Sequence, residues 1–136
     1  MLGANINTVG WPACREIDIM EQKGLDKNTI SAALNNLSSS GNTEKTKETS
    51  VTGSTTGFHV YAVNWTAEKI EFSIDGVVFY TYNTTVKTNE NLPYNASPFI
   101  ILNLVMGGSL EGDIPADFTE SKMEIDYVRI YRQKTS

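Results

Sequence analysis

The sequence has very little cysteine and histidine. Its 136 residues include one cysteine, Cys14, and one histidine, His59. A single cysteine excludes an internal disulfide and any zinc cluster built on several cysteines. A single histidine excludes a two-histidine metal site of the H-E-x-x-H type. We therefore expect a buried, unreactive thiol at Cys14 and a packed side chain at His59, inside a strand.

An excess of basic residues is also lacking. Eleven Lys and Arg residues stand against sixteen Asp and Glu residues, which gives a formal net charge of -5. A binding partner with a phosphate backbone needs a basic surface, so we expect no nucleic-acid partner. No apolar run approaches the roughly 20 residues that cross a bilayer, and residues 1–5 lack the features of a signal peptide. We therefore expect no membrane partner.

The composition is that of a chain that builds a hydrophobic core. Hydrophobic residues make up 40% of the sequence, charged residues 20% and aromatic residues 10%. These values are typical of a globular protein and not of a disordered or collagen-like one. The length suits one domain or part of one.

Strand patterns dominate the second half of the chain. Runs rich in β-branched and aromatic residues predict strands over 58–65, 70–74, 77–82, 99–106 and 123–131. Asp75-Gly76 is a typical two-residue hairpin turn between two of them. The polar stretch 37–57 predicts loops around one short, solvated strand, and no segment predicts a long helix. Many short strands separated by turns indicate an all-β sandwich or jelly roll.

Three carboxylates lie close together near the amino terminus. Glu16, Asp18 and Glu21 share a segment that has the character of a strand. In a regular strand Glu21 would point away from the other two, because side chains alternate between faces. A β-bulge at Ile19-Met20 would place two residues in one pleat position and return Glu21 to the same face.

Such a face has the groups that glycoside hydrolysis requires. With the bulge, the Cα atoms of Glu16 and Glu21 are about 13 Å apart, and converging side chains could bring their carboxyl groups to about 5 to 6 Å. That separation suits a retaining mechanism with an ionised nucleophile and a protonated acid. Asp18, between them, would raise the proton affinity of its neighbours. From spacing alone, a solvated acidic strand edge is an equally good interpretation.

The sequence resembles glycoside hydrolase family 16, in its laminarinase-like branch. The pattern E-[ILV]-D-x-x-E of the bulged members is matched by residues 16–21, after Trp11-Pro12-Ala13. Further matches lie along the whole chain, at residues 58–62, 65–66, 74–76, 102–104, 106–108 and 124–131. The resemblance implies a β-sandwich jelly roll of the concanavalin A-like type and a retaining endo-β-glucanase that hydrolyses β-1,3 or mixed-linkage β-glucan. It disfavours the solvated acidic edge.

The resemblance also implies roles for individual residues. Glu16 would be the nucleophile, Glu21 the general acid/base and Asp18 the assisting carboxylate. Trp11 would border the sugar cleft, although a packing role is a second interpretation. Asn103 would hydrogen-bond into the cleft or be a satisfied buried amide.

Cofactors, partners and location follow from the same resemblance. No cofactor is required, but many members hold a structural calcium through an aspartate that corresponds to Asp126, together with oxygen ligands from elsewhere. The partner would be a β-glucan polysaccharide. The resemblance implies a secreted or periplasmic protein.

The chain departs from the family pattern in three ways. Family domains are usually longer, so residues 1–136, with a polar tail at 131–136, would be one partial domain that lacks amino-terminal strands. Arg15 stands where a glycine is usual, and Asn35 stands near the position of a frequent histidine. Two alternatives stay open. The chain could be a non-catalytic or vestigial β-glucan-binding jelly roll, or a half-domain that completes its sandwich through a homodimer or a second chain.

Overall fold

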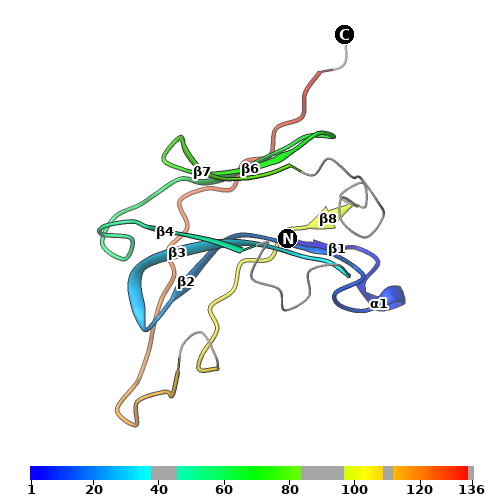
Figure 1. The fold of residues 1–136 in the computed structure, drawn as a ribbon. Coiled ribbons are helices and arrows are strands. Elements are labelled where there is room, and N and C mark those ends of the chain that lie inside the picture. The colour runs from blue at the N-terminus through cyan, green and yellow to red at the C-terminus, as the bar shows by residue number, and fades with distance from the viewer. Residues whose placement is uncertain (38–45, 84–96, 109–111, 135–136) are drawn as a thin grey trace.

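In the part of the chain that it describes, the computed structural model contains two antiparallel β-sheets and one very short helix. It describes residues 1–37, 46–83, 97–108 and 112–134. The sheets form two layers (Figure 1), which confirms the predicted all-β class. Within the described residues, no helix is long and apolar enough to cross a membrane.

The larger sheet has five strands in the order β4-β3-β2-β1-β8. Their bounds are β1 Leu2–Gly3, β2 Glu16–Lys23, β3 Asp26–Asn35, β4 Thr46–Ser50 and β8 Pro98–Phe99. The helix α1, Ile6–Val9, follows β1 and ends at Gly10. Strand β4 is the short, solvated strand predicted within the polar stretch, whose residues 38–45 lie outside the described ranges.

The smaller sheet is a meander of three strands, in the order β5-β6-β7. They are β5 Tyr61–Trp65, β6 Ile70–Ile74 and β7 Val77–Tyr82, so the predictions for 70–74 and 77–82 are confirmed. Both turn residues between β6 and β7 have positive φ, 51° at Asp75 and 81° at Gly76. This is the conformation that a two-residue hairpin turn requires.

Strand β5 begins later than the predicted residue 58. The carboxylate of Asp75 accepts a hydrogen bond from the backbone N–H of Val60 at 2.8 Å, and it lies 2.7 Å from Nδ1 of His59. A side chain therefore satisfies the Val60 N–H group. His59 lies before the strand and not inside it, and its bond to Asp75 raises its pKa.

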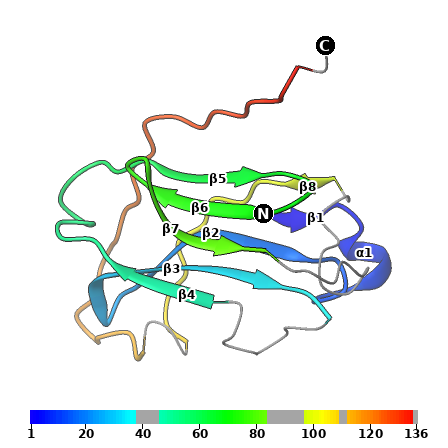
Figure 2. The same ribbon diagram turned by 45° about the horizontal axis from the view of Figure 1, so that its top comes forward.

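The core lies between the two layers. Ile17, Ala32 and Leu34 from the larger sheet meet Ile70 and Phe72 of β6, and Figure 2 shows the smaller sheet lying over the larger one. The Phe72 ring stacks on Tyr80 of β7 at a centroid distance of 5.2 Å. Cys14 is buried, as predicted, and burial raises the pKa of its thiol.

The predictions of strands over 99–106 and 123–131 are wrong. Only Pro98–Phe99 forms a strand, and residues 100–106 and 113–134 have no regular secondary structure. The segment 113–134 runs outside both sheets (Figures 1 and 2). A strand needs a neighbouring edge that supplies hydrogen bonds, and residue pattern gives only the tendency to pair.

Strand β3 was not predicted from the sequence. Strand β3, Asp26–Asn35, begins with polar residues and contains two alanines, which are poor strand formers. It is held by antiparallel pairing with β2 on one side and β4 on the other. Tertiary pairing therefore outweighs weak local propensity.

Candidate active site

The three carboxylates of β2 point to one face because the strand contains a bulge. Asp18 pairs with Ala33 and Glu21 pairs with Ser31, so three steps along β2 match two steps along β3. The register shift falls between Asp18 and Glu21, at the predicted position of the extra residue. Glu21 therefore shares a face with Asp18.

This face is turned away from the smaller sheet. Ile17, between Glu16 and Asp18, packs in the core against β6. Since neighbouring side chains of a strand point to opposite faces, the two acids lie on the outer face of the larger sheet. All three carboxylates are half-buried.

Trp11 lies beside Glu16. Its indole Nε1 donates a hydrogen bond of 2.9 Å to Oε2 of Glu16, and 55% of the residue's surface is exposed. An aromatic ring that is exposed and held next to a carboxylate can stack on a sugar ring. The structure thus brings Trp11 to the acids.

Asp18 is the most strongly perturbed of the three acids. Burial, followed by the negative charges of Glu16 and Glu21, raises its pKa to about 7. The amino group of Met1 and the amide of Asn35 act in the opposite direction. At neutral pH a large share of Asp18 is therefore protonated.

Burial also raises the pKa of Glu21, and the charge of Glu16 adds to this effect. The Ser31 hydroxyl donates a hydrogen bond of 3.4 Å to Oε2 of Glu21, and Lys23 lies near enough to lower the pKa. A carboxyl group with a raised pKa beside other carboxylates is the electrostatic arrangement that a general acid requires.

Strand β3 supplies two polar side chains that sequence reasoning did not assign to the site. Asn35 Nδ2 lies 2.8 Å from Oδ2 of Asp18 and 3.4 Å from Oε2 of Glu16. Ser31 faces Glu21 across the strands. Recognition of β3 as the partner of β2 would have identified both residues, since Asn35 pairs with Glu16 and Ser31 with Glu21.

Arg15 adopts a backbone conformation that favours glycine. Its φ is 71°, in the left-handed region. This explains in physical terms why a glycine suits the position before Glu16. The side chain is tolerated here at a cost in backbone strain.

The other two predicted site residues lie outside the strands of both sheets. Asn103 and Asp126 are exposed and lie in segments without regular secondary structure. Across the described parts of the chain, no group of three or more His, Cys, Asp or Glu side chains is arranged to hold a metal ion. Calcium also takes backbone carbonyl and amide oxygens as ligands, so a calcium site at Asp126 stays a prediction.

Comparisons with known proteins show which family and which relatives the chain is similar to. The family model described as Glycosyl hydrolases family 16 matches residues 4–129. Glucan endo-1,3-beta-glucosidase A1 of Niallia circulans is 31% identical over 144 residues, which covers 91% of this chain and 20% of that protein. Beta-glucanase of Rhodothermus marinus is 30% identical over 134 residues, covering 90% of this chain and 46% of that protein.

A solved structure is similar as well. The laminarinase of Flavobacterium sp. UMI-01 superposes with a TM-score of 0.67 and 44% sequence identity, over 70% of this chain and 41% of that one. The chain thus spans from a fifth to just under half of the length of these three proteins.

Proposed function

Since the chain belongs to family 16 of the glycosyl hydrolases, we propose that it is the acid-bearing part of a retaining endo-β-glucanase that cleaves β-1,3 or mixed-linkage β-glucan. The observation that carries the proposal is the bulge of β2, which puts Glu21 on the face of Glu16 and Asp18. Names of relatives such as glucan endo-1,3-beta-glucosidase and laminarinase support the substrate class.

In the first step, a carboxylate oxygen of Glu16 attacks the anomeric carbon. The bond from that carbon to the glycosidic oxygen breaks, and Glu21 gives its proton to the leaving oxygen. The raised pKa of Glu21 keeps this proton available, while the Trp11 N–H group orients Glu16. The product of this step is a glycosyl ester on Glu16.

In the second step, water attacks the anomeric carbon of the ester. Glu21, now ionised, takes a proton from the water, and the carboxylate of Glu16 leaves. Two displacements at one carbon retain its configuration. Asp18, half-protonated near neutral pH, lies between the two acids and limits the build-up of negative charge.

The remaining parts of the proposal concern substrate contacts and location. The exposed Trp11 ring stacks on a sugar beside the point of cleavage. Asn103, which is exposed, is proposed as a further substrate contact. A secreted or periplasmic location fits a polysaccharide substrate, because polymers of this size do not cross a membrane unaided.

The test is release of reducing ends from laminarin and mixed-linkage glucan by the purified chain, compared with Glu16→Gln and Glu21→Gln. Both variants keep the side-chain shape and remove the carboxylate. We expect each to lose turnover by roughly 100-fold or more, as is usual when a nucleophile or general acid is removed. Glu71→Gln, in β6, is the matched control and should keep the parent rate. A folded parent without turnover would contradict the proposal.

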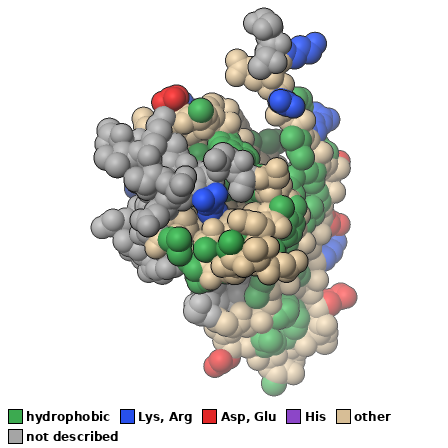
Figure 3. Space-filling view, turned by 90° about the vertical axis from the view of Figure 1, so that its right-hand side faces the viewer, with side chains coloured by type: hydrophobic (Ala, Val, Ile, Leu, Met, Phe, Trp, Pro, Cys, Tyr) green, Lys and Arg blue, Asp and Glu red, His purple; other side chains and the backbone are tan. Residues whose placement is uncertain are grey.

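A second proposal concerns assembly. The chain exposes 9547 Å² of surface, whereas a folded monomer of 15.0 kDa exposes about 7,000 Å². Much of this additional surface is apolar, because large hydrophobic side chains between Phe99 and Tyr131 are exposed. Figure 3 shows apolar side chains at the surface along one side of the molecule. We propose that two copies exchange these segments and complete each other's sheets. A surplus of roughly 2,500 Å² per copy is in the range of obligate dimers.

A further inference from the structure

Asn35 touches two of the three acids at once. It lies in β3 directly opposite Glu16 in the antiparallel ladder. Its single Nδ2 atom is 2.8 Å from Oδ2 of Asp18 and 3.4 Å from Oε2 of Glu16. The residue is half-buried, so water competes less for its amide hydrogens than on an open surface.

The chemistry of the amide suits this position. An asparagine NH₂ group carries two hydrogens, and each can be given to a different carboxylate oxygen. Ionised carboxylates only accept hydrogen bonds, so Asp18 and Glu16 cannot bond to each other when both are ionised, but both can bond to a shared donor. The amide does not titrate, so it donates in the same way over the whole working pH range.

We propose that Asn35 is a positioning residue that holds Asp18 beside the nucleophile Glu16 through its two amide hydrogens. The proposal rests on the proposed hydrolase function. Through this link Asn35 fixes the distance over which the Asp18 proton and the Glu16 charge interact. Because the donor is neutral, it aligns the pair and leaves the negative charge of Glu16 in place for the attack on the sugar.

The smaller sheet provides an internal comparison. Asn64 of β5 also faces a glutamate across the ladder, Glu71 of β6, and donates to it at 3.1 Å. Asn64 is exposed and contacts one carboxylate only, and Glu71, which is half-buried, also accepts a hydrogen bond of 2.5 Å from Nζ of Lys69. Asn64 therefore has the same cross-strand geometry without a second acid to hold, and Asn64→Ala is a matched control.

The experiment uses the full chain with laminarin as the substrate. For Asn35→Ala we expect kcat to fall by roughly 10-fold or more with KM unchanged, because the hydrogen bonds to Asp18 and Glu16 are both lost. Asn35→His restores a donor, so it should recover much of kcat above the pKa of the imidazole, where the ring is neutral. Asn64→Ala should match the parent.

A second readout does not depend on turnover. An NMR titration of the carboxyl carbons measures the pH midpoint of Asp18. The charged groups that act on Asp18 are Glu16, Glu21 and the amino group of Met1, and all three are unchanged in the variant. Loss of the Asn35 donor removes a bond to the charged form, so the Asp18 midpoint should move to higher pH in Asn35→Ala. Asn35→Asp keeps the shape and adds a charge, and it should move the midpoint further.

The outcomes separate the two proposals. An unchanged Asp18 midpoint together with an unchanged kcat in Asn35→Ala overturns the role of Asn35. An inactive parent whose Asp18 midpoint still depends on Asn35 overturns the hydrolase function and keeps the positioning contact. If Asn35→Ala does not fold, the Asn35→Leu titration decides, because leucine fills a similar volume and carries neither a donor nor a charge.

Discussion

Burial contributes more to the proton affinity of Asp18 than either neighbouring acid does. In the unfolded chain its pKa is near 3.9, and in the fold it is about 7. The folded state therefore binds the proton more tightly, so this carboxyl stabilises the fold at low pH. That contribution is lost as the pH rises from about 4 through 7, by on the order of 2 to 4 kcal/mol.

We therefore predict that Asp18→Asn removes part of the pH dependence of stability. The variant should gain free energy of unfolding relative to the parent as the pH rises from 4 to 8, because an amide has no proton to lose. Urea unfolding at several pH values measures this difference. Parallel stability profiles for the two proteins would contradict the pKa assignment.

Arg15 allows a prediction about backbone strain. A φ of 71° costs conformational free energy for any residue that has a Cβ atom, whereas glycine adopts it without that cost. We predict that Arg15→Gly has a free energy of unfolding about 1 kcal/mol higher than Arg15→Ala, measured by urea unfolding. Both variants lose the arginine contacts, so the comparison isolates the backbone. Equal stabilities would show that the strain is absent.

At the scale of the element, the bulge in β2 decides whether the acids can cooperate. Insertion of one alanine between Met20 and Glu21 moves Glu21 by one pleat position and turns it to the opposite face, because the side-chain period of a strand is two. We predict a loss of laminarin hydrolysis of roughly 100-fold or more, as for removal of the general acid.

Two controls accompany this insertion. Met20→Leu keeps the chain length and the volume, and it should retain the parent rate. Circular dichroism of the insertion variant should retain the β-sheet spectrum, so that the loss of rate reports on Glu21. Full activity in the folded insertion variant would refute the importance of the side-chain register after the bulge.

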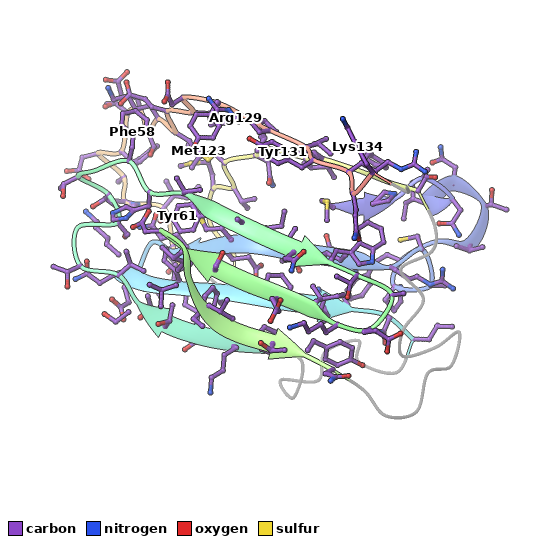
Figure 4. The ribbon with its side chains drawn as sticks, turned by 90° about the horizontal axis from the view of Figure 1, so that it is seen from above. Phe58, Tyr61, Met123, Arg129, Tyr131 and Lys134 are labelled. Atoms are coloured by element: carbon purple, nitrogen blue, oxygen red, sulfur yellow. The ribbon has the colours of Figure 1, made fainter. Side chains whose placement is uncertain are left out.

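At the scale of the whole molecule, the segment 113–134 is the unusual feature. Met123, Arg129, Tyr131 and Lys134 follow one another along it, outside the sheets (Figure 4). The Arg129 guanidinium lies 4.1 Å from the centre of the Tyr127 ring. This contact is within the segment itself and does not join it to the sheets.

Light scattering after size exclusion tests the proposed exchange of segments between copies. We predict a dimer of about twice 15.0 kDa for the parent, and a shift toward monomer for Ile125→Lys, which places a charge in an apolar contact. Lys122→Glu changes an exposed polar residue of the same segment and should leave the dimer intact. A parent that is monomeric at all concentrations, or that associates only with a different chain, contradicts the homodimer.

The sequence alone was sufficient for the all-β class, the β6–β7 hairpin and the three acids with their bulge. Each of these depends on short-range chemistry: alternation of side chains, turn residues with positive φ, and spacing along one strand. Such features are encoded within a few neighbouring residues. The roles of the acids stay predictions until turnover is measured.

Only the tertiary structure decided which strand faces the acids and which apolar runs find partners. Strand β3 has weak strand propensity but pairs on both sides, and so it brings Asn35 and Ser31 to the carboxylates. The strongly strand-like residues 123–131 form no strand within the described chain. Hydrogen bonding in a sheet is a property of two segments, and one segment's sequence cannot specify its partner.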